Sequence, residues 1–292
     1  MFDLSFGKES PVKTELLSLS RPQRCVLGVA LLAIALTAVR TLALFLAFDA
    51  EIGYFVTGAP LAIILYILEG LAVALSALLF FLSERKTDEA LPVPLSRTLP
   101  VTVGAGASAL LALACACTLL TTIGQTPAPR PLIFLAVICA AIGAGYFVTC
   151  AIAPFRRVQA ETSAIFGFLA VLALAMFLAV IYFDRYTQMN APHKMALQCC
   201  FLAAMLALLM EIRVSLGKGG ERARAAFCAL AALLCGAVGI SDTVAYIAGI
   251  YRDTLYLLFD LLCVALAVYS AARLCALCFP APNEKRREDE QV

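Results

Sequence analysis

Residues 162–183 read TSAIFGFLAVLALAMFLAVIYF, a stretch of more than twenty residues without a charged side chain. At 1.5 Å per residue it would form a helix of about 33 Å, enough to cross the roughly 30 Å hydrocarbon core of a bilayer. Because a backbone surrounded by lipid must satisfy its own polar groups, an α-helix is the expected conformation. The stretch therefore predicts a transmembrane helix.

Seven further apolar stretches of similar length accompany it. The predicted spans are residues 24–48, 58–83, 99–122, 130–152, 162–183, 193–214, 223–250 and 255–279. The composition agrees, since the 292 residues are 63% hydrophobic and 14% charged, with a mean hydropathy of +0.94. A soluble globular domain is far less apolar. We expect an all-α fold, a polytopic membrane helical bundle of eight transmembrane helices.

Two helix starts carry capping signals. Ser20, followed three residues later by Gln23, fits a capping box ahead of the first span. Asn190, ahead of Ala191 and Pro192, is placed to cap the sixth span.

The cations are segregated by loop. Both termini and one set of loops hold Lys8, Lys13, Arg21, Arg24, Arg85, Lys86, Arg97, Arg156, Arg157, Arg213, Lys218, Arg222, Arg224, Arg273, Lys285, Arg286 and Arg287. The other set holds Arg130, Arg185, Lys194 and Arg252. Short loops rich in Lys and Arg stay on the cytoplasmic side of a membrane. We therefore expect both termini in the cytoplasm, which agrees with an even number of spans.

The segments outside the spans are too short to be domains. We expect residues 1–23 to form a cytoplasmic arm, in which residues 10–20 are either a short interfacial helix or a solvated leader. Residues 24–279 would form the transmembrane domain and residues 280–292 a charged cytoplasmic tail. The short loops and compact form favour a bacterial cytoplasmic membrane. The expected surroundings are the lipid bilayer, and we expect no nucleic-acid partner.

Four ionisable residues interrupt the apolar spans. Arg40, Glu69, Asp242 and Asp260 lie roughly 12, 16, 12 and 8 Å from the outer ends of spans one, two, seven and eight. A charge at such a depth costs at least about 2.5–3.5 kcal/mol, so these side chains should face the bundle interior, pair or become neutral. If the four spans meet, one guanidinium lies beside as many as three carboxyls. That surplus of acid would suit a small solute, a cation or a proton.

The candidate binding site follows from this layer of charges. It comprises Arg40, Glu69, Asp242 and Asp260, with Tyr66, Gln198 and Tyr246 as polar neighbours. Nearby hydroxyl groups, such as Thr41 and Ser241, could instead join helices by hydrogen bonds. A structural interpretation has nearly equal weight, because buried ion pairs also fix the register of helices.

Other polar residues receive a structural interpretation. Glu211, Arg213 and Arg273 lie near inner helix ends, where charged side chains reach lipid headgroups. The lone His193 follows a polar outer loop, and helix capping and solvation account for both.

The twelve cysteines fall within apolar helices or near their inner ends. This placement is typical of small packing residues. Cys275 and Cys278 have CxxC spacing, but no second pair or nearby His accompanies them. We therefore expect no metal and no cofactor.

Specific catalytic motifs are absent from the sequence. It contains no HExxH, GxSxG or P-loop, and its one histidine leaves hydrolysis without an evident general base. Asp242 and Asp260 could form a carboxyl dyad of the aspartic-protease kind, but neither has the Gly-Asp context of intramembrane aspartyl proteases. We expect no catalytic residues and a protein that is not an enzyme.

Two functions remain. A small-solute or ion transporter predicts a water-accessible cavity that reaches the charges, with Gly58, Pro60, Gly236 and Gly239 as points where helices flex. A membrane sensor or assembly subunit predicts sealed charges and a surface that faces a partner protein. The sequence favours transport, because acids within a membrane mark solute paths.

Overall fold

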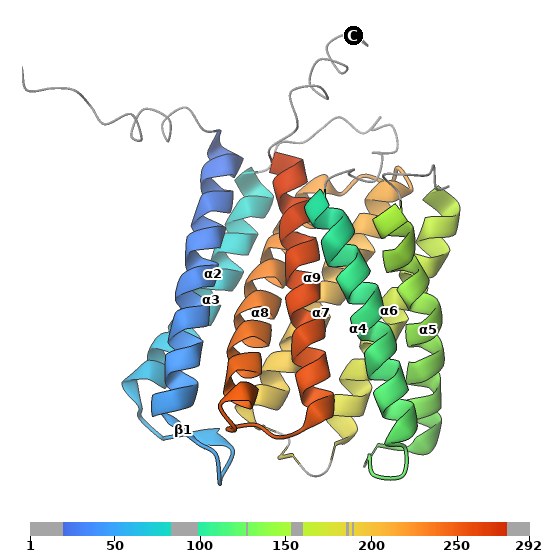
Figure 1. Cartoon of the computed structure of the whole chain (residues 1–292). Coiled ribbons are helices and arrows are strands. Elements are labelled where there is room, and N and C mark those ends of the chain that lie inside the picture. Colours follow the sequence, from blue (N-terminus) through green and yellow to red (C-terminus); the bar gives the residue numbers. More distant parts are fainter. Residues whose placement is uncertain are drawn as a thin grey trace, which may run out of the picture.

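The computed structural model describes residues 20–82, 99–126, 128–152, 160–184, 187–188 and 190–278. In this part of the chain eight long helices stand side by side (Figure 1). They are α2 (Arg21–Leu46), α3 (Pro60–Leu82), α4 (Leu99–Thr121), α5 (Arg130–Ile152), α6 (Ala160–Phe183), α7 (Pro192–Ser215), α8 (Glu221–Ile247) and α9 (Thr254–Cys278). Each is long and apolar enough to cross a bilayer. The prediction of an all-α membrane bundle is confirmed, and the chain is an integral membrane protein.

The helix ends follow the predicted spans to within three residues, and the largest differences are at the start of α2 and at the end of α8. The seventh span was expected to reach residue 250, whereas α8 ends at Ile247. Gly249 follows with φ +80°, a left-handed conformation in which glycine ends helices. The predicted N-terminal arm up to residue 19 and the tail beyond residue 278 lie outside the described residues.

One of the two predicted caps is confirmed. The backbone N–H of Ser20 donates to Gln23 Oε1 over 2.9 Å, as a capping box requires. The prediction for Asn190 is wrong, because the residue before α7 is Ala191 and no side chain caps this helix. Pro192 starts α7 instead, since its ring presets a helical φ and its missing N–H needs no partner.

A short hairpin joins α2 to α3. Its strands β1 (Phe48–Asp49) and β2 (Tyr54–Phe55) pair antiparallel. Asp49 Oδ1 closes the turn by accepting the backbone N–H groups of Glu51 and Ile52. We call the end of the bundle that carries this hairpin the outer end, and Figure 1 shows it below the helices.

The helices α7, α8 and α9 form the centre of the bundle. On one side α2 and α3 pack against α8, and on the other α4 packs against α9 and α5, while α6 bridges α5 and α7 (Figure 1). The beginning of α2 and the end of α9 meet at the inner end, where Gln23 Nε2 donates to the carbonyl of Cys278 over 3.0 Å. The described chain therefore begins and ends on the same side.

Three glycines allow helix backbones to touch. A methyl group at Gly104 of α4 would lie 2.7 Å from Tyr269 N, and one at Gly143 of α5 would lie 2.7 Å from Ala170 Cα. At Gly239 of α8 it would lie 2.5 Å from the carbonyl oxygen of Asp260. Small residues have this role where membrane helices cross closely.

The three glycines and the proline that were expected to allow helices to flex do not interrupt any helix. Gly236 and Gly239 lie inside α8, which is unbroken from Glu221 to Ile247. Gly58, with φ +78°, precedes α3, and Pro60 is the first residue of that helix. Neither α3 nor α8 is interrupted at these points, so the flexing interpretation finds no support in the helix geometry.

Candidate functional site

Arg40 and Asp242 form a bidentate ion pair between α2 and α8. Arg40 Nε donates to Asp242 Oδ1 over 3.1 Å, and Arg40 Nη2 donates to Asp242 Oδ2 over 2.9 Å. The guanidinium is 2% exposed and the carboxylate 0%. Two parallel hydrogen bonds fix the planes of the guanidinium and the carboxylate relative to each other, and such bidentate pairs are among the strongest between side chains. The contact anticipated between intramembrane charges of the first and seventh spans is present.

Glu69 of α3 is the second carboxylate beside Arg40. Its Oε1 lies 3.8 Å from Arg40 Nη1, and its side chain is 34% exposed at the edge of the bundle. The guanidinium therefore faces two carboxylates, of which one is buried and tightly bound and the other is half-buried and loosely held.

His193 connects Asp260 of α9 to this pair. His193 Nε2 lies 3.5 Å from Asp242 Oδ2 and 3.3 Å from Asp260 Oδ1. Asp260, which is 1% exposed, thus joins the cluster through an imidazole and not through the guanidinium. The four residues predicted from their depth are brought together, and a histidine links the last of them.

The interpretation of His193 by helix capping and solvation is wrong. His193 is the second residue of α7 and is buried. Its ring stacks on Tyr251, with centroids 4.4 Å apart and planes 19° apart, and Tyr256 covers it at 5.1 Å. The spacing of His193, Leu197 and Cys200, at intervals of four and three residues, was the signal that could have placed it on a buried helix face.

Hydroxyl groups extend the contact between α2 and α8. Thr41 Oγ1 donates to Ser241 Oγ over 3.1 Å, and Ser241 Oγ donates to the carbonyl of Thr37 over 3.2 Å. The expectation that Thr41 and Ser241 join helices is confirmed. These bonds hold the two helices in the register that aligns Arg40 with Asp242.

The three predicted polar neighbours lie outside the cluster. Tyr66 of α3 is 58% exposed and lies on the surface of the bundle. Gln198 and Tyr246 are half-buried, and within the described part of the chain no hydrogen bond joins either of them to the four charged residues.

A second buried ion pair lies in the inner half of the bundle. Arg273 Nε is 2.5 Å from Glu211 Oε1, and Tyr269 OH donates to Glu211 Oε2 over 2.8 Å. Glu211 and Arg273 are both buried, so their interpretation as interfacial charges is wrong. Arg213 is exposed at the helix end, as expected. The pair links α7 to α9, the same two helices that His193 and Asp260 join at the outer end.

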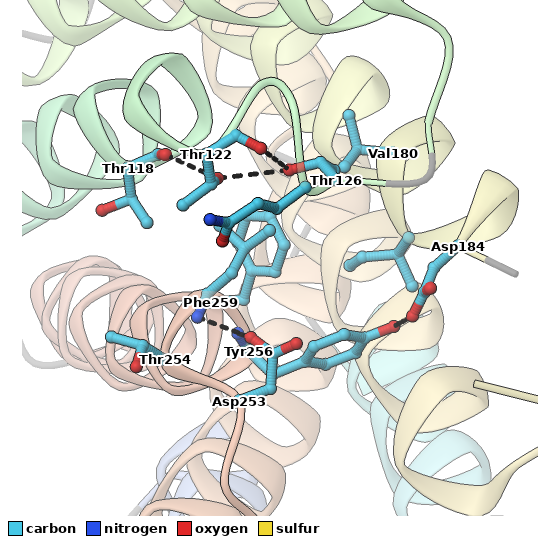
Figure 2. Close-up of a pocket in the computed structure, with 12 residues that line it drawn as sticks. Thr118, Thr122, Thr126, Val180, Asp184, Asp253, Thr254, Tyr256 and Phe259 are labelled. Atoms are coloured by element: carbon cyan, nitrogen blue, oxygen red, sulfur yellow. Dashed lines mark hydrogen bonds between the residues drawn. The ribbon is translucent and has the colours of Figure 1, made fainter. Parts of the chain in front are cut away.

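A cavity of about 370 Å³ opens at the outer ends of α4, α6 and α9 (Figure 2). It is lined by Thr118, Thr122, Gln125, Thr126, Val180, Ile181, Asp184, Asp253, Thr254, Leu255, Tyr256 and Phe259. Two of these residues are acidic and none is basic. Apolar side chains share the lining with hydroxyl, amide and carboxylate groups, and the two carboxylates favour a cationic molecule over an anionic one.

Tyr256 stands between the cavity and the buried charges. Its ring lies against His193, and its hydroxyl donates to Asp184 Oδ2 over 2.7 Å. Figure 2 shows this bond at the edge of the cavity. One aromatic side chain thus touches both the cavity carboxylate and the buried imidazole.

Tyr251 closes the cluster from the loop after α8. Burial raises the pKa of its phenol, and the nearby carboxylate of Asp242 raises that pKa further. Its hydroxyl is buried and has no hydrogen-bond partner among the described residues. A protonated donor without a partner therefore adjoins the stacked His193 ring.

The side chains of His193, Asp242 and Asp260 also have the donor types of a metal site. One ligand atom from each lies within 4.8 Å of the others. A metal ion bound here would compete with Arg40, because both oxygens of Asp242 already accept its hydrogen bonds. No spacing in the sequence indicated this group, since each residue comes from a different helix.

No family model, no curated protein and no solved structure matches this chain. The chemistry of its own side chains therefore carries the functional argument.

Proposed function

We propose that this membrane protein transports a small solute or ion, and that His193 and Asp260 carry a proton exchanged during transport. The observation that carries the proposal is the position of His193 between two buried carboxylates. An imidazole changes its charge within the physiological pH range, so it can accept and release a proton there.

The charge balance of the cluster supports a proton or cation site. Arg40 offsets the charge of Asp242, with which it makes two hydrogen bonds. Among the described residues, the cationic partner in ion-pair contact with Asp260 is His193 in its protonated form. Since a buried, unpaired carboxylate is costly, the pair binds a proton or a cation in its resting state.

The neighbouring cavity supports a cationic solute. Asp184 and Asp253 give it negative charge, and no lining residue would repel a cation. Rotation of Tyr256 away from Asp184 would join the cavity to His193, in the way that side chains and loops gate many binding sites. The proton and the cationic solute would then compete for the same carboxylates.

The alternative is a sensor or assembly subunit whose charges are structural. Its specific support is burial, since Arg40, Asp242 and Asp260 are at most 2% exposed. A sealed ion network of this kind would fix the register of α2, α8 and α9 without exchanging protons. The two functions therefore differ in whether the cluster titrates from the aqueous phase.

Infrared difference spectroscopy on the reconstituted protein decides between them. When the bathing solution is switched between about pH 8 and pH 5, we expect a reversible band from a buried carboxylic acid. Asp260→Asn should remove that band, and the exposed loop variant Glu51→Gln should keep it. A spectrum without any buried carboxyl change, identical in Asp260→Asn, would favour the structural alternative.

A flux measurement then addresses transport itself. Proteoliposomes with an internal pH dye would be exposed to ammonium-type and divalent cations under an imposed membrane potential. We expect proton movement that depends on one class of cation and that falls at least about tenfold in Asp260→Asn, because loss of a transferring acid or base typically costs about 10²–10⁴-fold in proton-transfer rate. Equal flux in wild type and Asp260→Asn would contradict a proton-carrying role for this residue.

A further inference from the structure

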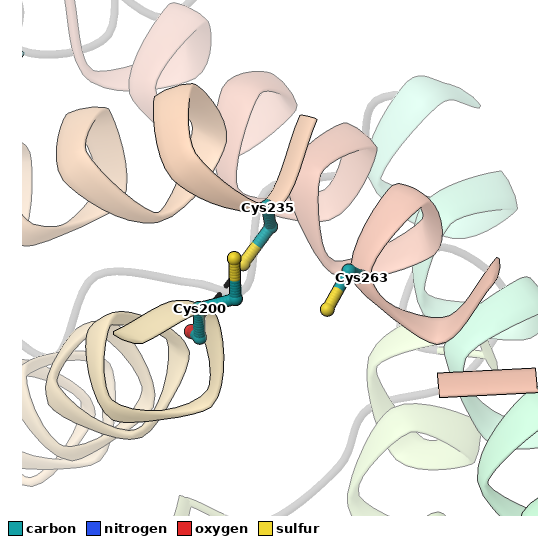
Figure 3. Close-up of side chains that lie close together, drawn as sticks. All are labelled: Cys200, Cys235 and Cys263. Carbon is teal, nitrogen blue, oxygen red and sulfur yellow. Dashed lines mark hydrogen bonds between the residues drawn. The ribbon is translucent and has the colours of Figure 1, made fainter. Parts of the chain in front are cut away.

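Three cysteines meet between the same three helices, inward of the charge cluster. They are Cys200 of α7, Cys235 of α8 and Cys263 of α9 (Figure 3). Their sulfur atoms all lie within 4.8 Å of one another, and each residue is 0% exposed. Cys235 Sγ also donates to the carbonyl of Cys200 over 3.4 Å.

The register of the helices stacks this cysteine group beneath the charge cluster. Cys200 follows His193 by seven residues on α7, and Cys235 precedes Asp242 by seven residues on α8. Seven residues are about two helical turns, so each pair shares one face of its helix. The contact region of α7, α8 and α9 thus holds two groups of side chains of types that bind metals, the histidine with its two carboxylates and, further inward, the three cysteines.

We infer that Cys200, Cys235 and Cys263 form a binding site for a thiophilic metal ion, with Cu(I) as the best fit. Sulfur atoms about 2.3 Å from a shared ion lie about 4 Å apart in a trigonal plane. The observed group needs to contract by less than about 1 Å to reach that geometry. Rotation of thiol side chains on three fixed helices can supply such a movement.

The number and the type of the ligands both favour Cu(I). Zn²⁺ in structural sites takes four ligands, whereas this group offers three sulfurs. Thiolates are the ligands that select Cu(I). When Cu(I) binds, the three S–H bonds break, three Cu–S bonds form and the three protons leave to the medium.

Packing alone is the competing explanation, and the chain offers a matched comparison. Cys228 lies on α8 two turns from Cys235 and is equally buried, at 2% exposure. Within the described residues, it belongs to no group of three converging metal ligands. The inference goes beyond the proposed transport function and does not depend on it.

Copper titration of the full chain tests the inference. The parent is the Cys275→Ser/Cys278→Ser variant, which lacks the two cysteines at the accessible inner end of α9. Purified under reducing, anaerobic conditions, it would be titrated with Cu(I) against a coloured Cu(I) chelator. We expect one tightly bound equivalent with an ultraviolet sulfur-to-copper band. Cys235→Ser should weaken binding at least about 100-fold, since even an outer-shell change costs about 10–100-fold.

Cys228→Ser should bind as the parent does, and Cys200→Ala and Cys263→Ala should each weaken binding as Cys235→Ser does. Thermal unfolding without copper identifies any variant that fails to fold, and the remaining ligand variants then carry the test. Absence of a bound equivalent in the parent, unchanged binding in the ligand variants, or equal loss in Cys228→Ser would overturn the site. A disulfide among the three in the untreated protein would also overturn it. The carboxyl infrared band of Cys235→Ser reports on the proton site separately.

Discussion

Arg40 is the residue on which the buried charge network depends, because a guanidinium keeps its charge inside a protein. Arg40→Gln removes the bidentate partner of the buried Asp242 and leaves only His193, at 3.5 Å, and we expect a loss of about 3–5 kcal/mol in the free energy of unfolding. Glu69→Gln should cost less, since Glu69 is half-buried and 3.8 Å away. Detergent-driven unfolding in mixed micelles measures both.

The double variant Arg40→Gln/Asp242→Asn separates the pair from its surroundings. The double variant leaves no unpaired charge at this pair. Its loss in the free energy of unfolding should therefore be smaller than the sum of the losses in the two single variants. If the losses simply add, the two side chains are not energetically coupled and the bidentate contact contributes nothing specific.

At the residue scale, the sequence predicted the charges better than their partners. Arg40, Glu69, Asp242 and Asp260 were identified by the cost of a charge in lipid, which depends only on position along the chain. His193 was missed because its location at a helix start is equally typical of a solvated cap. Only the packing of Tyr251 and Tyr256 around its ring distinguishes the two.

At the element scale, Gly239 determines how closely α8 approaches α9. Its missing side chain lets the carbonyl of Asp260 come within 2.5 Å of the position that a methyl group would take. Gly239→Ala should separate the helices and cost about 1–3 kcal/mol in the free energy of unfolding. It should also reduce the carboxyl infrared band, because Asp260 would shift away from His193.

Gly236→Ala provides the control on the same helix. A methyl group there would lie 3.6 Å from Ala267 Cβ, an ordinary contact. We expect little loss of stability, or a small gain, since alanine favours a helix over glycine by roughly 1 kcal/mol. Equal destabilisation by the two variants would contradict the role assigned to Gly239.

At the scale of the whole molecule, the expected orientation places both chain ends in the cytoplasm. The described chain begins and ends on one side, where Gln23 meets Cys278. A green fluorescent protein fused after Val292 should fluoresce, and alkaline phosphatase inserted after Glu51 in the β1–β2 hairpin should be active. An active phosphatase at the C-terminus would reverse the orientation and make the inner end external.

The eight-helix membrane fold followed from the sequence alone. Span length, hydropathy and the distribution of cations are local properties, and each of them acts on one helix or loop at a time. The depth expected for Arg40, Asp242 and Asp260 was derived in the same way, because depth follows from distance along a helix.

Only the tertiary structure decided which side chains meet. Several spans are apolar on every side, so these spans contain no amphipathic face that would set the rotation of the helix about its axis. That rotation is decided by close packing, as where Gly239 meets α9, and by buried pairs such as Arg40 with Asp242. The contact of His193 with Asp260 and the meeting of the three cysteines follow from that packing, because spacing along one helix does not indicate which residue of another helix it meets.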